Sequence, residues 1–436
     1  MSEWDRESRR EFLVRGAALA AAGSLLAANE AAALADPLPQ VRDRMLPRAN
    51  EPVRIGVIGT GGMGTEHCSA LMRLQKAGRA DLQLVALADV CQPRLNEAEQ
   101  KVTAGGATWP VTKYTNYRQL LADPSLHGVL IATQEHWHAR MVEQAVAAGK
   151  AVYVEKPMTL RLNEALRLRK LVQSNPTATV IVGTQRVLMG VYQEAAKWVA
   201  AGAIGKATSS QTSYCRNSKE GEWLYYKIDP AWQPGVNLDW KEWCGPLGKA
   251  DWNPEVYARW RRYRKYSTGI IGDLLVHQLA PMMQVVNAGW PVRVVASGGH
   301  YVDHAMENHD QVNLNIEFEA GHTMVVAGST CNEVGLETLV RGHRANLNVA
   351  GNKLTLRPER IYAEEVQEKT YDAPNLGEVQ DLLRLNWIEC MRGNQKPASD
   401  VELGTKVMVV ADLATRSIWE GKAFGFDPDK FKAFKI

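Results

Sequence analysis

A glycine-rich turn is the clearest chemical feature of the sequence. The apolar run Val53–Ile58 leads into Gly59-Thr60-Gly61-Gly62-Met63-Gly64, and a helical pattern begins immediately afterwards. In this G-x-G-x-x-G arrangement the first glycine permits a tight turn, the second lets the backbone approach a pyrophosphate, and the third lets helix and strand pack closely. The helix N-terminus adds free N–H groups and a positive dipole. These residues therefore predict a dinucleotide-binding site.

An acidic residue at the end of the second predicted strand indicates which dinucleotide binds. That strand covers residues 82–90, and Asp89 lies 25 residues after Gly64. A carboxylate at this position accepts hydrogen bonds from a ribose 2′-hydroxyl and repels a 2′-phosphate, which favours NAD over NADP. Arg94 nearby leaves NADP as the less favoured cofactor. The structural alternative is a strand-end Asp that only caps the next helix.

Strand-like and helix-like runs alternate through the first half of the chain. Strands are predicted at 53–58, 82–90, 128–133, 151–155 and 179–183, with helices at about 139–148 and 162–174. This alternation predicts a doubly wound parallel sheet, and therefore an α/β protein with a Rossmann domain over residues 53–186. Ligands of such sheets bind at the carboxyl ends of the strands. The candidate site segments are therefore 133–138, 155–157 and 183–186.

The pattern changes after about residue 207. Strand-like runs then follow one another without helices between them, at 293–302, 311–320, 322–330, 338–351 and 353–358. Consecutive strands joined by tight turns such as Glu319-Ala320-Gly321 are typical of an antiparallel sheet. Two helical patterns, at 379–391 and 401–420, close the chain. The sequence predicts a second, α+β domain over residues 187–436, with a large, open and mostly antiparallel sheet.

Composition excludes several classes of function. The formal charge of +3, from 51 Lys and Arg against 48 Asp and Glu, is too balanced for a nucleic-acid or membrane-surface protein. The six cysteines lie far apart without a C-x-x-C pair, which argues against a zinc knuckle or a disulfide scaffold. Residues 300–310 carry three histidines with several carboxylates, but their spacing matches no standard ligand pattern. We expect a small-molecule substrate and no metal.

Five segments together resemble the glucose-fructose oxidoreductase and inositol dehydrogenase family, Gfo/Idh/MocA. They are the glycine turn, Ala-Thr-Gln-Glu-His-Trp-His-Ala at 132–139, Ala-Gly-Lys-Ala-Val-Tyr-Val-Glu-Lys-Pro at 148–157, Gly-Thr-Gln-Arg at 183–186, and Asp273-x-x-x-His277. The sequence departs from this family at two points. Gln134 stands where many relatives have proline, and Leu-Leu-Val separates Asp273 from His277 where relatives often carry glycine and small residues.

The resemblance implies hydride transfer between NAD and a sugar CH–OH group. It implies that Lys156 points at the reacting oxygen, that His277 takes the proton and that Asp273 orients the imidazole. Arg186 is a candidate donor to the ribose or to the substrate, with a structural ion pair as the alternative. The resemblance also implies that the second domain closes over the nicotinamide and that the C-terminal helices pack back near the first domain. The implied cofactor contacts are residues 59–64, Asp89, Thr133, Trp137, His138, Glu155, Lys156 and Arg186.

Alternatives remain at this stage for the reaction and for the aromatic residues. An NAD-dependent glycoside hydrolase would oxidise its substrate transiently, eliminate the aglycone, add water and return the hydride. A non-catalytic sugar sensor would use the same fold. Six tryptophans that fall within 38 residues could stack on sugar rings or anchor a loop-rich segment. They are Trp223, Trp232, Trp240, Trp243, Trp252 and Trp260.

The N-terminus reads as an export signal. Ser-Arg-Arg-Glu-Phe-Leu-Val at 8–14, a weakly apolar stretch at 16–28 and Ala-Leu-Ala at 33–35 are typical of a twin-arginine signal peptide over residues 1–36. The apolar stretch is too short to cross a bilayer. Residues 37–52, with four prolines, are expected to be a linker. We therefore expect an exported or periplasmic protein. Because this route carries folded proteins, the signal also indicates a tightly held cofactor. Separately, the open sheet face of the second domain favours a homo-oligomer.

Overall fold

The first domain is built on a six-stranded parallel sheet. The computed structural model describes residues 37–436, so the predicted signal peptide lies outside the described residues. The strand order is β3-β2-β1-β4-β5-β6, and every neighbouring pair is parallel. The strands are β1 (Val53–Ile58), β2 (Leu82–Ala88), β3 (Thr112–Tyr114), β4 (Gly128–Ile131), β5 (Ala151–Val154) and β6 (Val180–Val182). The predicted doubly wound sheet is confirmed, and β3 is a strand that the sequence pattern did not predict.

Burial on both faces explains the composition of the central strands. Every residue of β4 and β5 is buried, as expected where helices cover a parallel sheet on both sides. The covering helices of this domain are α2 (Gly62–Lys76), α3 (Gln92–Ala104), α4 (Tyr117–Leu121), α5 (Glu135–Ala147) and α6 (Leu162–Gln173). Helix α5 begins four residues earlier than the sequence pattern indicated, so Trp137 and His138 lie in its first turn rather than in a loop.

The second domain carries a ten-stranded sheet with the order β14-β13-β12-β11-β7-β10-β9-β8-β15-β16. All described pairs are antiparallel except β7 with β10, which confirms the mostly antiparallel prediction. Its strands are β7 (Ala207–Cys215), β8 (Pro291–Gly299), β9 (Gln311–Phe318), β10 (His322–Ser329), β11 (Thr338–Gly342), β12 (Ala345–Ala350), β13 (Lys353–Pro358), β14 (Lys369–Asp372), β15 (Phe424–Asp427) and β16 (Lys432–Lys435).

The predicted strand at 338–351 is in fact two strands. A turn at His343 and Arg344 separates β11 from β12, and the two pair with each other as a hairpin. The run Arg-Gly-His-Arg at 341–344, which has no apolar side chain, marks the turn that the prediction missed. In β9 the alternation has its expected meaning, because Val312, Leu314 and Ile316 are buried while the residues between them are exposed.

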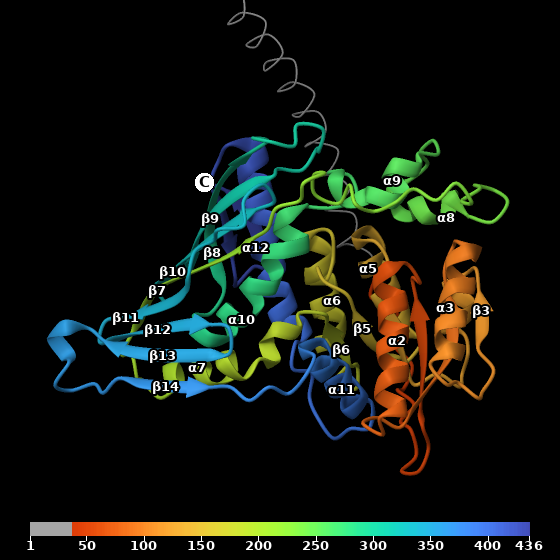
Figure 1. Cartoon of the computed structure of the whole chain (residues 1–436), viewed down its shortest axis with the longest axis horizontal. Helices are drawn as coiled ribbons and strands as arrows, with labels where there is room; N and C mark the ends of the chain where they lie inside the picture. The colour runs from red at the N-terminus through yellow and green to blue at the C-terminus, as the bar shows by residue number, and fades with distance from the viewer. Residues whose placement is uncertain (1–36) are drawn as a thin grey trace, which may run out of the picture. The chain divides into compact units, whose positions relative to one another are not determined.

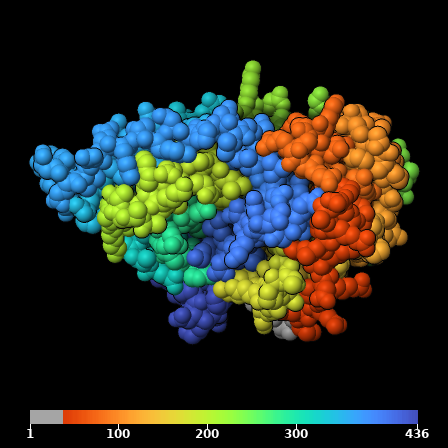
Figure 2. Space-filling model, turned by 90° about the horizontal axis from the view of Figure 1, so that it is seen from below, coloured from red at the N-terminus to blue at the C-terminus, as the bar shows by residue number. Residues whose placement is uncertain are grey.

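Helices from the end of the chain lie between the two sheets. Helix α12 (Val401–Glu420) packs against β8 on one side and α6 on the other, and α10 (Val276–Val286) packs beside it and beside α7 (Gly190–Ala200). Helix α11 (Val379–Met391) places Trp387 and Met391 in the core of the parallel sheet. Figure 2 shows its blue surface between the red and orange surface of the first domain and the yellow-green surface of α7. No helix among residues 37–436 is long and apolar enough to span a membrane.

A long segment between β7 and α10 crosses the carboxyl edge of the parallel sheet. We call residues 222–262 the strap; it contains α8 (Trp240–Cys244) and α9 (Pro254–Arg259), which lie above α3 and β3 in Figure 1. The Gln92 N–H donates to the Asn237 carbonyl and the Asp239 N–H to the Val90 carbonyl, each at 2.9 Å. The strap is therefore fastened to the chain directly after β2.

Clustered aromatic residues form the core of the strap. Trp240 stacks on Trp243 with ring centroids 4.6 Å apart, and Tyr257 packs against both Trp232 and Trp252. These residues form one hydrophobic cluster with Cys91 of the first domain. Most of the predicted tryptophan group therefore anchors the segment.

Candidate active site at the edge of the parallel sheet

The glycine turn has the geometry that its sequence predicts. Gly59 has φ +86°, which favours glycine, and a Cβ at this residue would lie 2.8 Å from the Ala132 carbonyl. A Cβ at Gly64 would lie 1.8 Å from the carbonyl oxygen of Gly59. Helix α2 can therefore approach the turn only because residue 64 is glycine. The N-terminal residue of this helix, Gly62, lines a cleft.

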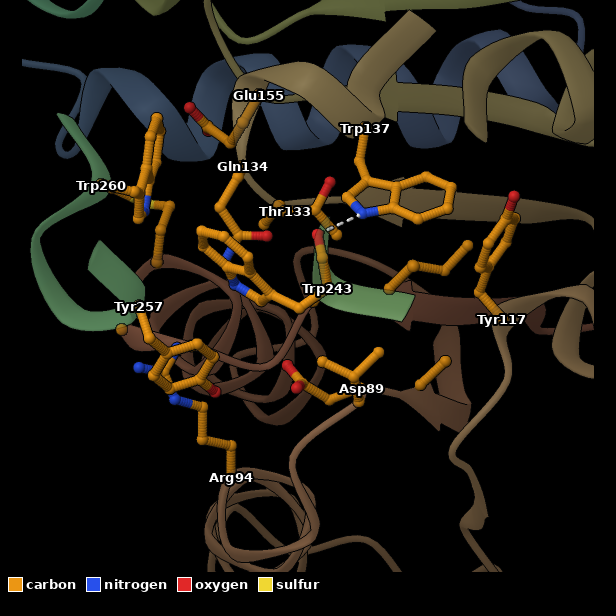
Figure 3. Close-up of a pocket in the computed structure, with 18 of the residues that line it drawn as sticks. Asp89, Arg94, Tyr117, Thr133, Gln134, Trp137, Glu155, Trp243, Tyr257 and Trp260 are labelled. Atoms are coloured by element: carbon orange, nitrogen blue, oxygen red, sulfur yellow. Dashed lines mark hydrogen bonds between the residues drawn. The ribbon is translucent and has the colours of Figure 1, made fainter. Parts of the chain in front are cut away.

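A cleft with a volume of about 340 Å³ runs from the glycine turn to Lys156. It has one wall from the strand ends of the first domain and another from the strap (Figure 3). The predicted residues that line it are Gly59, Gly61, Gly62, Met63, Asp89, Thr133, Trp137, Glu155 and Lys156. Of the tryptophans that could stack on a sugar ring or anchor a segment, Trp243 and Trp260 line the cleft, and the lining residues that the sequence did not predict include Tyr117, Tyr226, Tyr257 and Arg261. All of these except Tyr117 belong to the strap.

Asp89 fastens the glycine turn to the end of β2. Its carboxylate accepts hydrogen bonds from the backbone N–H of Thr60 at 2.7 Å and of Cys91 at 2.8 Å. Burial raises the pKa of this carboxyl. Arg94 lies beside it and stacks on Tyr257 and Trp232, with its Cζ 4.7 and 5.1 Å from the ring centroids. Asp89 thus combines the structural role of a strand-end Asp with a place on the cleft wall.

Three contacts hold the strap against the start of α5. Trp137 Nε1 donates to the Trp243 carbonyl at 2.9 Å (Figure 3). His136 Nε2 lies 2.9 Å from the same oxygen. Burial lowers the pKa of His136 to about 4, so its ring is neutral at ordinary pH. Arg118 pairs with Glu242 at 2.5 Å. These contacts close the strap over the side of the cleft that faces α4 and α5.

Lys156 is held at the end of the cleft by Asp273. Its Nζ donates to the Asp273 carboxylate and to the Asp273 main-chain carbonyl, each at 2.8 Å. Arg261 Nε donates to the same carboxylate oxygen at 2.8 Å. Burial alone would raise the pKa of Asp273, but Arg261 and Lys156 outweigh it and hold that pKa far below its usual range. Asp273 is therefore an anion shared by two cations.

This arrangement differs from the role expected for Asp273. Within residues 37–436 no hydrogen bond joins Asp273 to His277, so Asp273 positions Lys156 and does not orient the imidazole. Asp273 lies in a π-helical turn, Ile271–Leu275, and α10 begins only at Val276. Asp273 and His277 therefore do not share one face of a regular α-helix. The Asp273 carboxylate bonds to the two cations instead.

His277 and Arg186 form a neighbouring group around Tyr214. The His277 ring centroid lies 6.1 Å from that of Tyr214, and Arg186 Cζ lies 5.3 Å from the same ring. His277 Nδ1 is buried without a partner, and burial with the nearby Lys156 lowers the pKa of the ring to about 3. The imidazole is therefore neutral and has an unoccupied nitrogen. Neither His277 nor Arg186 lines the dinucleotide cleft.

His138 is placed differently from the prediction that it contacts the cofactor. Its two ring nitrogens lie 2.7 Å from the Pro157 carbonyl and 3.1 Å from the Thr133 carbonyl. The side chain is buried, and it does not line the cleft. The structure therefore gives His138 the role of tying two strand ends together.

Glu155 is fixed by a buried network that the sequence did not reveal. His67 Nδ1 accepts a hydrogen bond from Arg384 Nε at 3.0 Å, so His67 Nε2 carries the hydrogen that is donated to Glu155 at 2.9 Å. Gln380 Nε2 donates to the same carboxylate oxygen at 3.2 Å. Burial would raise the pKa of Glu155, but His67 and Lys156 lower it to about 2. Glu155 therefore presents a fixed negative charge on the cleft wall.

The histidine-rich run at 300–310 has a structural role. The Asp310 carboxylate accepts hydrogen bonds from the backbone N–H groups of Tyr301, Val302 and Asp303. Asp303 pairs in turn with Arg262 at 2.6 Å, which fastens the end of the strap to the second domain. No group of three His, Cys, Asp or Glu residues in the described part of the chain could hold a metal ion.

The fold and the cleft define a two-domain enzyme of the Rossmann class, with a glycine turn and a strand-end carboxylate that fit a dinucleotide. Family models identify it further. The model described as oxidoreductase family, NAD-binding Rossmann fold, matches residues 53–184, and the model of the family's C-terminal alpha/beta domain matches residues 249–425. The chain therefore belongs to the GFO/IDH/MocA oxidoreductase family, and its first domain is an NAD-binding domain. The predicted family, enzyme class and cofactor are confirmed.

Curated relatives and solved structures agree with this assignment. The chain is 29% identical over 387 residues to the scyllo-inositol 2-dehydrogenase (NAD(+)) of Bacillus subtilis, a match that covers 86% of this chain and 96% of that protein. It is 25% identical over 323 residues to the myo-inositol 2-dehydrogenase of Thermotoga maritima, covering 73% and 77%. A levoglucosan dehydrogenase in complex with NADH and levoglucosan has the same fold, with a TM-score of 0.63, 18% identity, and coverage of 88% and 100%.

Proposed function

We propose that this enzyme transfers hydride between a sugar or cyclic polyol and an NAD molecule that it does not release. The observation that carries the proposal is the placement of Lys156, held by Asp273 at the end of the NAD cleft. Relatives named for inositol oxidation support a polyhydroxylated ring as the substrate. NAD, when bound along the glycine turn, supplies the hydride acceptor.

Lys156 and His277 would divide the work at the reacting hydroxyl. An ammonium group has three N–H donors, and Asp273 takes two of them, so one remains for the substrate oxygen. That donor stabilises negative charge on the oxygen as its hydrogen leaves. The neutral His277, with an unoccupied Nδ1, accepts the hydroxyl proton. Asp273 acts by holding the Lys156 ammonium group in place.

The strap supports the retention of NAD. Its backbone bonds to Val90 and Gln92, its ion pair with Arg118 and its contacts with α5 all lie beside the cleft, so NAD would leave only if several contacts opened together. We propose that the protein is exported by the twin-arginine route, on the strength of the sequence at 8–14. Outside the cytoplasm free NAD is scarce, so a retained cofactor would be reoxidised by a second substrate in place.

We further propose a homo-oligomer that uses the outer face of the ten-stranded sheet. On this face Val295 and Val325 are each 41% exposed, next to polar residues of β9 such as Asn313 and Asn315. A broad, flat sheet face of this kind suits pairing with a second copy. Light scattering on the purified protein measures the mass directly, and a monomer at micromolar concentration would contradict this proposal.

Cofactor analysis and paired-sugar assays test the main proposal. The purified protein is denatured to ask whether NAD is released, and the native protein is then incubated with a sugar or inositol and with a keto-sugar as acceptor. We expect about one NAD per chain and exchange between the two sugars, abolished in Lys156→Ala and retained in the surface variant Lys113→Ala. Release of aglycone from a glycoside without net NADH would instead identify a hydrolase. Protein that retains no NAD would contradict cofactor retention.

A further inference from the structure

Arg261 brings a second cation to the reacting end of the cleft. It lies on the strap, lines the cleft and stacks on Trp260, with its Cζ 4.2 Å from the ring centroid. Of its side-chain nitrogens, only Nε takes part in a hydrogen bond among residues 37–436, to Asp273. Its other two guanidinium nitrogens have no hydrogen-bond partner among residues 37–436. Arg261 therefore presents an unoccupied pair of donors to the cleft.

The place of Arg261 is fixed relative to Lys156. Lys156 Nζ and Arg261 Nε each lie 2.8 Å from the same oxygen of Asp273, so they are no farther apart than twice that distance. A group bound by the outer nitrogens of Arg261 would therefore lie close to the hydroxyl that Lys156 contacts. Stacking on Trp260 also limits rotation of the guanidinium plane, so its donors keep a defined direction.

No carboxylate of the described residues binds the outer nitrogens of Arg261. Asp273 accepts from Arg261 Nε alone and shares the same oxygen with Lys156. The buried Glu135 and Glu155 lie nearby, but their hydrogen bonds are with other side chains. The outer nitrogens of Arg261 are therefore open to an anionic group on the substrate.

We propose that Arg261 binds a carboxylate of the substrate, so that the preferred substrates are sugar acids with the carboxylate near the reacting hydroxyl. This inference rests on the proposed function. The planar fork of a guanidinium matches a carboxylate with two parallel hydrogen bonds. The pyrophosphate of NAD is the other anion in reach of the cleft, but the N-terminus of α2 and the nearby Arg94 supply its binding groups.

Sugar pairs that differ only in one group test this inference. The pairs have the same ring with either a hydroxymethyl group or a carboxylate, for example glucose with glucuronate and galactose with galacturonate. The measured quantity is the ratio of kcat/KM for the acid to kcat/KM for the neutral sugar. We expect wild-type ratios above one, and a ratio about 10- to 100-fold lower in Arg261→Gln, as for the loss of hydrogen bonds between charged groups.

Two further variants and a binding measurement complete the design. Arg261→Lys keeps the charge and the contact with Asp273 but loses the fork, so its ratio should fall between those of the wild type and Arg261→Gln. Arg293→Gln removes an arginine from the outer face of the sheet, where it pairs with Glu317, and should leave the ratio unchanged. NAD content and NAD affinity are measured for every variant, and circular dichroism checks that each is folded.

Three outcomes separate this inference from the proposed function. If wild type prefers the neutral sugars, or if Arg261→Gln lowers both sugars equally, Arg261 does not bind a substrate carboxylate. If Arg261→Gln instead weakens NAD binding and leaves the ratio unchanged, Arg261 belongs to the cofactor site, and the inference is likewise overturned. If neither member of any pair reacts although NAD is bound, the proposed function itself has failed.

Discussion

Replacing His67 tests whether the buried network holds Glu155 in its ionised form. His67 is fully buried, packs its ring against Tyr153 and donates to Glu155 while accepting from Arg384. His67→Leu fills similar space but removes both hydrogen bonds. A hydrogen bond to a charged group contributes about 1.5–3 kcal/mol, and a buried N–H left without a partner costs about 1–3 kcal/mol. We expect His67→Leu to lose about 3–5 kcal/mol of unfolding free energy at neutral pH.

The pH dependence gives this prediction its sharper form. The pKa of Glu155 is lowered to about 2 in the folded protein, so its ionisation stabilises the fold above the unfolded pKa of about 4.3. This contribution, on the order of 3 kcal/mol, is lost as the pH falls from about 4.3 towards 2. The pKa of the buried His67 is lowered as well, which also makes acid destabilising below about 6.5. The stabilisation from ionised Glu155 is reduced in His67→Leu, and the effect of His67 protonation is absent. Acid therefore destabilises the wild type more than the variant, so the difference in unfolding free energy between them should shrink in acid.

Urea denaturation at about pH 7 and about pH 3, where much of the Glu155 contribution is lost, measures both effects. His67→Gln is the matched control, because its amide can still donate to Glu155, and we expect it to recover at least half of the lost stability. NAD affinity should follow the same order, since Glu155 lines the cleft. Equal losses in His67→Leu and His67→Gln, or a deficit in His67→Leu that is the same at both pH values, would show that His67 only fills space and refute this reasoning.

Three further perturbations follow from the site. Lys156→Ala and His277→Ala should each lower kcat by about 10²- to 10⁴-fold while NAD content, measured after denaturation, stays near one per chain. Gly64→Ala would place a Cβ 1.8 Å from the Gly59 carbonyl oxygen, so the purified variant should contain little NAD; full occupancy would contradict the role given to this glycine. Burial raises the pKa of Glu135 to about 7, and its Oε2 has no partner. The contribution of Glu135 to stability should therefore be lost as pH rises from about 4.3 through 7, and Glu135→Gln should gain about 1–3 kcal/mol over wild type at about pH 8, measured by urea denaturation.

Local patterns were sufficient for the fold of the first domain and for the last two helices. The glycine turn follows from residue types at fixed spacing, and the bounds predicted for α11 and α12 are those observed. The parallel sheet follows from the alternation of strands and helices, because two parallel strands must be joined by a crossover connection, which is usually a helix. The same logic predicted a second sheet but not β7, β14, β15 or β16. Short strands at a sheet edge, or polar on one face, carry weak periodicity.

The partners of the functional side chains were decided only by the tertiary structure. The spacing of Asp273 and His277 predicts that the two side chains share one face of a helix. Asp273 bonds instead to Lys156 and Arg261, because a π-helical turn and two cations redirect its carboxylate. His67 and Arg384 meet although 317 residues separate them. A sequence encodes which positions must be buried or charged. Which distant group satisfies each of them depends on how the strap and α11 pack, and that is a property of the whole fold.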